Sequence, residues 1–265
     1  MATATRPMKF IHLDGRHVTE PIIGLGGSCI VIQQHQYAVK IPKLSRPLQE
    51  DATESDHESD YNEILVVTQA LLAEKLIYQR LGEHPQIVRC HNASDTEPMI
   101  EMEIADKGSL RSFLQKADIG KAQKLVWLKQ IASALVFVHE RKVIFGDVRL
   151  DNCLLDQKLH VKLSDFGNST LMSLDWDLVG ADEQGYSVQT DIGQFGALIY
   201  EITTLEGCKF DLWQGSNRKI ATWPQRSSLP ATEGKWLAEV MEKCWTRGFV
   251  SVTELRDELE KCSPN

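Results

Sequence analysis

The sequence predicts an α+β fold with two lobes, in which a small β-rich N-lobe precedes a larger helical C-lobe. Two observations support this prediction. β-branched residues dominate the segments near the start of the 265-residue chain, and apolar residues recur at helical spacing in most later segments. The change falls near residues 104–108. We therefore expect a single domain over residues 1–265, with an N-lobe at about residues 10–104 and a C-lobe at about residues 105–262.

The N-lobe is expected to begin with three strands. The stretches "IIGLGGSCIVI" (residues 22–32) and "YAVKI" (residues 37–41) carry the β-branched residues, and "QQHQ" (residues 33–36) supplies the turn between them. Residues 49–60, "QEDATESDHESD", contain six acidic residues and no large apolar one, which predicts a flexible loop. Residues 61–81 then show apolar residues at helical spacing, and "GEHP" ends this helix.

The middle of the chain is expected to complete the sheet and to open the helical lobe. The stretches "QIVRCHN" (residues 86–92) and "PMIEMEI" (residues 98–104) look like strands, and "ADKGSL" (residues 105–110) looks like a turn that starts a short helix. A long helix is predicted over residues 121–141. Its apolar stripe consists of Leu125, Leu128, Ile131, Leu135 and Val138.

The rest of the C-lobe is predicted to be one hairpin and three helices. "CLLDQKLHVKL" (residues 153–163) has the pattern of a hairpin with its turn near residues 156–158. Helices are expected over residues 190–204, 235–245 and 251–261. For the last helix, Ser251 has the position of an N-cap, and Glu254 would complete a capping box.

Composition narrows the class of protein. The formal net charge is −8 and no basic stripe stands out, so we expect no nucleic-acid partner beyond a nucleotide. No run approaches the roughly 18 apolar residues of a membrane span, and the first residues lack the apolar core of a signal peptide. The six cysteines lie far apart without a CxxC pair, which predicts reduced thiols in an intracellular protein of the cytoplasm or nucleus.

Two features of the N-lobe are candidates for ligand binding. Gly24, Gly26 and Gly27 lie between two expected strands, where glycines let backbone N–H groups approach an anion, although the same pattern also suits a plain hairpin turn. Lys40 ends "YAVK", and a lysine among strand apolars either faces water at an edge or points into a cleft beside an acid. Glu74, on the next predicted helix, is either that acid or an ordinary solvated residue.

The C-lobe concentrates charge in the stretch "VIFGDVRLDNCLL", residues 143–155. Asp147, Arg149 and Asn152 lie between two strand-like segments, and Asp165 follows 18 residues after Asp147. Carboxylate and amide oxygens are the ligands that Mg²⁺ prefers, a further carboxylate can accept a proton from a hydroxyl, and an arginine can neutralise phosphate charge. Turns also favour Asp and Asn. However, an ordinary turn rarely produces both the cluster at Asp147 and the later Asp165 beside strands, so we expect a functional site.

The motifs, taken in order, resemble the catalytic domain of eukaryotic protein kinases over most of residues 22–261. The matching segments are "GLGGSCIV", "YAVK", "AEKLIYQRLGEHPQIV", "IEMEIADKGSL", "FGDVRLDN", "SDFG", "QTDIGQFGALIYEITT" and "CWTRGF". Each motif alone is weak, but chance rarely produces all of them in this order. The short length and the "GD" of the catalytic loop are also similar to fungal kinase-like sequences. The resemblance implies a two-lobed protein-kinase-like fold.

The resemblance also implies ATP and Mg²⁺ as cofactors, with the nucleotide between the lobes. Lys40, held by Glu74, would orient the phosphates, Met102 would be the gatekeeper, and Glu103 and Ala105 would offer backbone groups to adenine. The nucleotide-binding set implied in this way is Gly24, Gly26, Gly27, Val31, Ala38, Lys40, Glu74, Met102, Glu103 and Ala105.

The C-lobe residues of the resemblance would carry out the transfer. Asn152 and Asp165 would hold Mg²⁺, and Asp147 would accept the proton of the substrate hydroxyl. Arg149 stands where the family usually has a lysine and would add positive charge near the γ-phosphate. Asp191 would support the catalytic loop from behind. The implied catalytic set is Asp147, Lys40 and Arg149.

Four departures from the family pattern bear on function. Cys29 stands at the third glycine of the loop. Phe145 and Gly146 replace the usual His-Arg, whose arginine receives an activation-loop phosphate, so we expect activity without such phosphorylation. "ADEQGYSVQTD" (residues 181–191) replaces the Ala-Pro-Glu motif, which argues against the usual peptide-binding platform. Finally, the acidic stretch lengthens the spacing between the lysine and its glutamate to 34 residues.

Three functions fit these observations. The first is an active protein kinase acting on hydroxyl side chains of protein substrates, and "DVRLDN" is nearer to the serine/threonine class than to the tyrosine class. The second is a pseudokinase that serves as a binding or scaffold module, which the altered glycine loop and the missing Ala-Pro-Glu motif favour. The third is a small-molecule phosphotransferase, because "GD" with an Asn five residues after the Asp also suits such enzymes. The sequence favours the first and leaves the oligomeric state open.

Overall fold

The computed structural model of the chain describes residues 10–44, 54–213 and 220–264. The chain divides into two compact units. The first unit comprises Met1–Gln79 and Arg89–Ile104, and the second comprises Arg80–Val88 and Ala105–Asn265. The first is rich in strands and the second in helices, which confirms the predicted α+β fold class.

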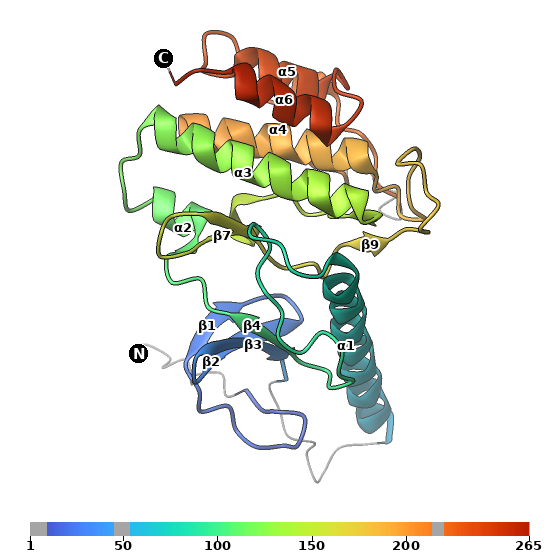
Figure 1. Ribbon diagram of the computed structural model, residues 1–265. Coiled ribbons are helices and arrows are strands. Elements are labelled where there is room, and N and C mark those ends of the chain that lie inside the picture. Colours follow the sequence, from blue (N-terminus) through green and yellow to red (C-terminus); the bar gives the residue numbers. More distant parts are fainter. Residues whose placement is uncertain (1–9, 45–53, 214–219, 265) are drawn as a thin grey trace, which may run out of the picture. The chain divides into compact units, whose positions relative to one another are not determined.

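The first unit contains a four-stranded antiparallel sheet and most of the long helix α1 (Glu54–Leu81) (Figure 1). The strand order is β1-β2-β3-β4, so each strand pairs with its neighbour in sequence. The strands are β1 (Ile22–Leu25), β2 (Cys29–Gln34), β3 (Tyr37–Pro42) and β4 (Ile100–Glu103). The three strands predicted for residues 22–41 are therefore present.

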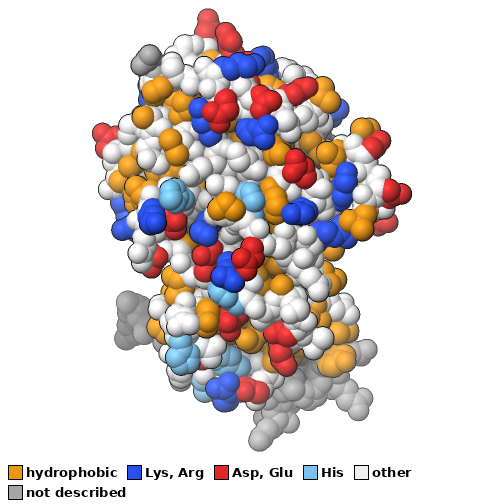
Figure 2. Space-filling model, in the orientation of Figure 1, with side chains coloured by type: hydrophobic (Ala, Val, Ile, Leu, Met, Phe, Trp, Pro, Cys, Tyr) orange, Lys and Arg blue, Asp and Glu red, His pale blue; other side chains and the backbone are white. Residues whose placement is uncertain are grey.

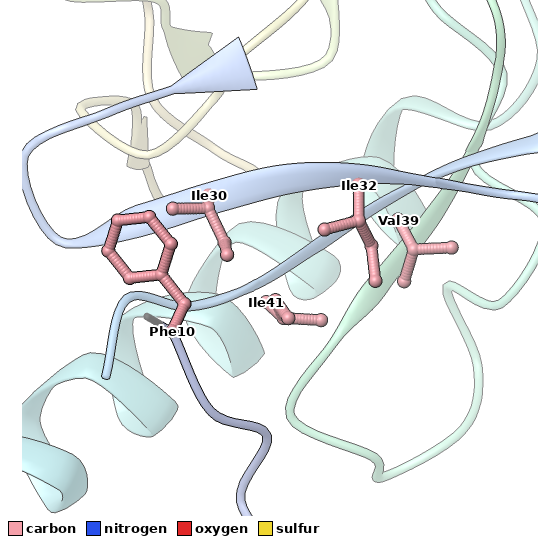
Figure 3. Packing of buried hydrophobic residues seen from close by; sticks show 5 residues of the cluster. All are labelled: Phe10, Ile30, Ile32, Val39 and Ile41. Atoms are coloured by element: carbon pink, nitrogen blue, oxygen red, sulfur yellow. The ribbon is translucent and has the colours of Figure 1, made fainter. Parts of the chain in front are cut away.

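One face of this sheet forms a small apolar core. Ile30 and Ile32 of β2 pair directly with Ile41 and Val39 of β3, and all four side chains pack with Phe10 (Figure 3). Because successive side chains of a strand point to opposite faces, the residues between them face the other way. The sheet thus has a core face and a second face.

The structure corrects two expectations for the first unit. Residues 49–60 were expected to form a loop, but α1 begins at Glu54, while residues 49–53 lie outside the described ranges. Acidic residues are favoured near a helix N-terminus by its partial positive charge, so acidity alone does not exclude a helix. The expected strand over residues 86–92 is wrong too. The first part of this segment makes backbone hydrogen bonds to Leu163, and the later part makes them to Glu101 and Glu103. Because the partner changes, no continuous ladder forms.

The second unit is built around helices (Figure 1). Its helices are α2 (Leu110–Leu114), α3 (Lys121–Glu140), α4 (Val188–Thr204), α5 (Ala238–Trp245) and α6 (Val252–Lys261). Helix α4 packs against α3 and α5, and α6 packs against α3 (Figure 1). The predicted long helices agree with these bounds within a few residues. The predicted N-cap Ser251 accepts from the Glu254 N–H, but the Glu254 carboxylate accepts from Val250 rather than completing the capping box.

Short strands of the second unit flank the charged stretch found in the sequence. The predicted hairpin is present as β7 (Cys153–Leu155) and β8 (Val161–Leu163), which β5 (Gly108–Ser109) extends to three strands. Strand β6 (Val143–Ile144) pairs with β9 (Thr170–Leu171). Residues 145–152 therefore run between β6 and β7, with a 3-10 turn, η1 (Leu150–Asn152), at their end.

On the face of the molecule shown in Figure 2, neither sign of charge dominates. Lys and Arg side chains are interspersed with Asp and Glu on this face. Within the described ranges, every helix is too short or too polar to span a bilayer.

Candidate active site

The second face of the first unit's sheet collects the predicted nucleotide-binding residues. Register pairs Gly24 with Val31, Val31 with Lys40, and Ala38 with Met102. Directly paired residues of an antiparallel sheet share a face, and Ala38 and Lys40 share one because they are two residues apart. Five of the predicted side chains or glycines thus lie on the face opposite the apolar core.

The glycine turn is a tight connection between β1 and β2. The Gly26 N–H donates to the Cys29 carbonyl, and a Cβ on Gly26 would lie 3.1 Å from that oxygen. A Cβ on Gly27 would meet no atom within 4 Å, so the turn is open on that side. The Lys43 ammonium donates to the carbonyls of Gly26 and Gly27, at 3.2 and 3.3 Å. Lys43 therefore fixes this turn, a role that sequence reasoning missed.

Cys29 is the first residue of β2 and its side chain is buried. It pairs with Pro42 in the ladder. The thiol therefore packs within the first unit.

Lys40 and Glu74 form the ion pair predicted for the first unit. The Lys40 ammonium lies 2.7 Å from the Glu74 carboxylate, and it bridges β3 and α1 across 34 residues of sequence. The Glu74 side chain is almost fully buried and that of Lys40 is largely buried. Buried charges are costly without a partner, so the pair fixes the direction in which the lysine extends.

Met102, the predicted gatekeeper, is buried on β4, and its sulfur accepts a hydrogen bond from the Tyr78 hydroxyl at 3.6 Å. The two residues predicted to offer backbone groups are placed in different units. The Glu103 N–H donates to the Arg89 carbonyl in the first unit. Ala105 opens the main segment of the second unit, where its carbonyl accepts from the Gly108 N–H.

The loop around Asp147 in the second unit is held from behind by Asp191 of α4. The Asp191 carboxylate is fully buried and accepts from the N–H groups of Phe145 and Gly146, at 2.9 and 2.7 Å. It also bonds to Nε2 of the buried His139 at 2.8 Å. A buried carboxylate needs several donors, and here three different residues supply them. This is the support role predicted for Asp191, and His139 is an addition that the sequence did not reveal.

Gly146 is required by its surroundings. Its φ is +78°, in the left-handed region, and an added Cβ would lie 2.5 Å from the Asn168 carbonyl oxygen. No side chain fits there on this backbone. The sequence departure from His-Arg to Phe145-Gly146 is therefore steric as well as chemical. Phe145 packs edge-on against Phe166 at 5.1 Å between ring centroids.

Gln194 of α4 clamps the backbone on both sides of Asp147. Its Oε1 accepts from the Val148 N–H and its Nε2 donates to the Gly146 carbonyl, both at 3.0 Å. A single amide thus fixes the two peptide groups that flank the predicted base. The residue stands in the segment "TDIGQFG", three positions after Asp191, but nothing in the sequence alone gives it this role.

The Asp147 carboxylate is half-buried and accepts two hydrogen bonds. The side-chain N–H groups of Asn152 and Asn168 donate to Oδ2 at 2.9 and 3.3 Å. Burial raises the pKa of Asp147 above its ordinary value, the two amides and the nearby Arg149 oppose this shift, and the Asp165 carboxylate adds to it.

Asn152 and Asp165 provide oxygen atoms suited to a magnesium ion. Both hydrogen bonds of the buried Asn152 Nδ2 are directed at Asp147, which leaves the amide oxygen as the atom that can face a cation. Asp165 is exposed and has a φ of +61°, while Phe166 beside it is fully buried. Such a strained conformation persists only where neighbouring residues hold it. A carboxylate with an amide oxygen fits Mg²⁺ chemistry.

Arg149 belongs to an ion-pair cluster beside the loop. Its guanidinium binds the Asp151 carboxylate at 2.7 Å. Asp151 also binds Arg111 of α2 at 2.9 Å, and Arg111 reaches Glu201 of α4 at 3.0 Å. The cluster therefore joins α2, the loop and α4. Arg149 is exposed and points its charge at Asp151 in this structure.

The segment that replaces the Ala-Pro-Glu motif is a turn organised by Asp182. Its carboxylate accepts from the N–H groups of Gln184 and Tyr186, and from the Thr170 hydroxyl at 2.6 Å. The Ser169 hydroxyl donates to the Phe145 carbonyl at 2.7 Å. The hydroxyl groups of Ser169 and Thr170 are thus used in internal hydrogen bonds.

The predicted site residues fall into two groups, one in each unit. The first unit brings together Gly24, Gly26, Gly27, Val31, Ala38, Lys40, Glu74, Met102 and Glu103. The second unit brings together Asp147, Arg149, Asn152 and Asp165, and it also contains Ala105. The sequence missed the residues that hold these groups in place, because their roles arise from long-range contacts. These are Lys43, His139, Asn168, Asp182 and Gln194.

Comparison with known proteins supplies the family. The family model for "Protein tyrosine and serine/threonine kinase" matches residues 59–251, most of the chain. The chain belongs to the protein kinase family. The family model covers the ion-pair glutamate and the whole loop around Asp147. The resemblance inferred from the ordered motifs is thereby confirmed.

Individual relatives span several classes of kinase. A probable serine/threonine-protein kinase of Dictyostelium discoideum is 23% identical over 218 residues, which are 75% of this chain and 15% of that protein. The serine/threonine/tyrosine-protein kinase HT1 of Arabidopsis thaliana is 24% identical over 260 residues, or 88% of this chain and 62% of that protein. Protein kinase C eta type of Mus musculus is 33% identical over 135 residues, 49% of this chain and 17% of that protein. The chain spans less than two thirds of each of these relatives.

Proposed function

We propose that this chain is an ATP- and Mg²⁺-dependent protein kinase that transfers the γ-phosphate of ATP to serine or threonine hydroxyls of protein substrates. The observation that carries the proposal is the setting of Asp147. Its carboxylate is half-buried and oriented by two asparagines, and its backbone is fixed by Asp191 and Gln194. Such preorganisation is what proton acceptance from a hydroxyl requires.

Lys40 binds phosphate oxygens of the nucleotide in this proposal. Its ammonium is fixed by the buried carboxylate of Glu74, so the charge is presented in one direction before any ligand arrives. A Cβ on Gly27 would meet no atom within 4 Å, so the glycine turn is open on that side, where backbone N–H groups can approach an anion. Val31 and Ala38 flank Lys40 on the second face of the sheet, and Met102 closes it at β4.

Asn152 and Asp165 hold Mg²⁺ in this proposal, through the amide oxygen and the carboxylate described above. The ion would neutralise charge on the transferred phosphate. Asp147 accepts the hydroxyl proton and aligns the attacking oxygen, and Asn168 and Asn152 keep its carboxylate in position. Arg149 supplies positive charge beside the loop.

Serine and threonine are favoured as acceptors by the loop sequence "DVRLDN" and by relatives whose names state serine/threonine kinases. Tyrosine is the alternative, since the relatives also include a tyrosine-protein kinase receptor of Caenorhabditis elegans, 27% identical over 190 residues. Phosphoamino-acid analysis of the labelled product distinguishes the two.

Activity without activation-segment phosphorylation is part of the proposal. Gly146 has no room for the arginine that would receive the phosphate, and Asp182 already ties the segment to Thr170. We expect enzyme treated with a phosphatase to keep its activity. Loss of activity after that treatment would contradict this point without touching the rest.

We place the activity inside the cell, in the cytoplasm or nucleus. All six cysteines are thiols rather than disulfides, as expected in a reducing compartment. Burial raises the pKa of Cys153 and of Cys244, so these two thiols pack as apolar groups rather than react.

The decisive experiment is a thermal shift of the purified chain with ATP and Mg²⁺, followed by transfer of radiolabelled phosphate to itself and to generic proteins. We expect stabilisation by ATP with Mg²⁺ and label on serine or threonine. Binding without transfer would favour a scaffold module instead. Transfer only to a small alcohol or amine would favour a small-molecule phosphotransferase.

A further inference from the structure

Lys75 of α1 is a buried cation that the proposed mechanism does not use. It follows Glu74 in the chain, and only 2% of its side chain is exposed. Its ammonium binds the Asp95 carboxylate and donates to the Glu97 carbonyl at 2.9 Å. A buried ammonium is costly without such partners, so this contact ties α1 to residues 95–97. All of these residues lie in the first unit.

The segment that receives this ammonium is a turn held by its own hydrogen bonds. The Asn92 side-chain amide donates to the Met99 carbonyl at 3.1 Å, and its oxygen accepts from the Glu101 N–H at 2.8 Å. Within the turn, the Asp95 carboxylate accepts from the Glu97 N–H at 3.0 Å. The turn therefore presents its carboxylate and its carbonyl in fixed positions.

The turn leads directly into the strand that pairs with β3. The Glu97 carbonyl, which accepts from Lys75, also accepts from the Met99 N–H at 2.8 Å. The next residue, Ile100, begins β4 and pairs with Lys40 of β3. The buried cation of α1 is thus linked, through one short segment, to the strand position opposite Lys40.

These contacts form a closed circuit around Glu74. The ion pair connects Lys40 to Glu74, and the next residue, Lys75, connects α1 to residues 95–97. That segment continues to Ile100, which pairs with Lys40. Neighbouring side chains of a helix project about 100° apart around its axis, so Glu74 and Lys75 hold the helix in two directions. A rotation of α1 that separated Glu74 from Lys40 would also strain the contacts of Lys75.

We propose that Lys75 is a positioning residue for nucleotide binding, which anchors α1 to residues 95–97 and so sets the rotation of the helix at which Glu74 meets Lys40. The inference rests on the proposed function, because it takes Lys40 as the group that binds phosphate. It adds that the first unit fixes this ion pair from within, before a nucleotide arrives. A merely structural role for Lys75 would stabilise the unit without acting through Glu74.

The first test measures the use of ATP by two variants. Lys75→Met keeps the apolar stem and loses the ammonium, and we expect kcat/KM for ATP to fall about tenfold, the scale of one lost hydrogen bond to a charged group. Asp95→Ala removes the same contact from a side chain that is 45% exposed. We expect it to cost about threefold, because the Glu97 carbonyl still accepts from Lys75.

Asp14→Ala is the matched control for Asp95→Ala. Asp14 also lies in the first unit and also binds a cation, Arg16, at 2.7 Å, but both side chains of that pair are exposed. We expect Asp14→Ala to leave kcat/KM for ATP unchanged. Thermal unfolding checks that each variant folds. An unchanged kcat/KM in folded Lys75→Met and Asp95→Ala overturns the inference.

A double-mutant cycle tests whether the effect of Lys75 passes through Glu74. In Glu74→Gln the ion pair is already broken, so the addition of Lys75→Met should lower kcat/KM for ATP by less than about twofold further. A merely structural contribution would lower it by the same factor in both backgrounds. Equal losses in the wild-type and Glu74→Gln backgrounds therefore overturn the inference.

A second cycle needs no activity. Asp95→Ala and Lys40→Met each remove one end of the circuit, and each should lower the midpoint of thermal unfolding. Because the contacts support one another, the combined drop should be smaller than the sum of the single drops by about 2 °C or more. Asp14→Ala combined with Lys40→Met is the control and should be additive. Additive drops for Asp95→Ala with Lys40→Met contradict the circuit.

The two cycles separate this inference from the proposed function. A chain that shows the coupling in thermal unfolding but transfers no phosphate keeps the positioning of Glu74 by Lys75 and loses the kinase proposal. A chain that transfers phosphate but shows additive drops, and equal losses of kcat/KM in both backgrounds, keeps the kinase proposal and loses this inference.

Discussion

The two units hold their functional side chains in different ways. In the first, the ion pair of Lys40 with Glu74 joins a strand to a helix. In the second, the carboxylate of Asp191, the amide of Gln194 and two asparagines hold one short loop around Asp147. The first arrangement relies on two complementary charges, and the second on several hydrogen bonds from neutral N–H groups to two carboxylates and on the neutral amide of Gln194.

This difference predicts different responses to substitution. An ion pair between largely buried groups fails as a unit, because removing one charge leaves the other unpaired. A loop with several hydrogen bonds loses only part of its order when one bond is removed, provided that the backbone itself can keep its conformation. The predictions below test that contrast, from the largest expected effect to the smallest.

Replacing Asp147 by Asn removes the proton acceptor and keeps the shape of the side chain. We expect phosphate transfer to fall on the order of 10²–10⁴-fold. Folding should be preserved, because an Asn oxygen can still accept from Asn152 and Asn168. Turnover is measured with radiolabelled ATP, and folding by thermal unfolding. Unchanged turnover in a folded variant would remove the assignment of Asp147.

Replacing Glu74 by Gln leaves the Lys40 ammonium without its buried carboxylate. Hydrogen bonds to charged groups contribute about 1.5–3 kcal/mol, so we expect kcat/KM for ATP to fall by roughly 10- to 100-fold. Glu63→Gln is the control, because Glu63 is exposed on the same helix. An equal effect of both substitutions would show that helix charge, and not the ion pair, is responsible.

Replacing Gly146 by Ala tests the backbone of the loop. The left-handed φ and the Asn168 carbonyl both oppose a Cβ, so we expect a loss of about 1–3 kcal/mol in the free energy of unfolding. Gly27→Ala serves as the stability control, because a Cβ there meets no atom within 4 Å. Denaturant unfolding gives both values. Equal stability of the two variants would contradict the steric interpretation of Gly146.

Replacing Gln194 by Met removes both hydrogen bonds of the clamp and keeps the length of the side chain. We expect kcat to fall roughly 10- to 30-fold, with KM for ATP nearly unchanged, because two neutral hydrogen bonds contribute about 1 kcal/mol each. Gln189→Met on the same helix is the control, since Gln189 bonds to Phe249 and Val250 instead. Gln194→Glu keeps the acceptor for Val148 and should lie between wild type and Gln194→Met.

The pH profile should show the smallest effect. Because burial raises the pKa of Asp147, transfer should fall on the acid side at a higher pH than an ordinary aspartate would give. The same shift means that the folded state binds this proton more tightly than the unfolded state. Its stabilising contribution is therefore present at low pH and is lost as pH rises through the raised pKa.

Asp147→Asn provides the comparison for that pH effect. The variant should be slightly more stable than wild type above the raised pKa of Asp147, because no desolvated charge remains. Melting temperatures across a pH series measure this difference. A variant that is less stable than wild type at every pH would contradict the assigned direction.

Local patterns in the sequence were sufficient for much of the fold. The helix over residues 121–141 and the hairpin over residues 153–163 follow from periodicity and turn residues, and both are present. The start of α1 was missed because acidic residues suggested a solvated loop, although a helix N-terminus favours them. Residues 86–92 were predicted to be a strand because composition cannot show that their bonding partners change midway.

The site residues, like the elements of the fold, divide into those that local sequence predicts and those that depend on distant segments. Residue type and order along the chain were sufficient to find Asp147, Asn152 and Asp165, because the chemistry of a carboxylate or an amide follows from the residue type alone. Gln194 and His139 were missed, because an amide on a helix and a histidine in a core have many ordinary roles. Their roles depend on segments 46 or more residues away, and no local pattern records such contacts.

The close approach of Gly146 to the Asn168 carbonyl has an evolutionary consequence. A descendant of this chain could not acquire phosphate-dependent control through one substitution at this position, because any new side chain would collide before it met a phosphate. The backbone of the neighbouring segment would have to shift in the same lineage. Because the colliding atom is a backbone carbonyl, no substitution of the Asn168 side chain would by itself make room for a side chain at residue 146.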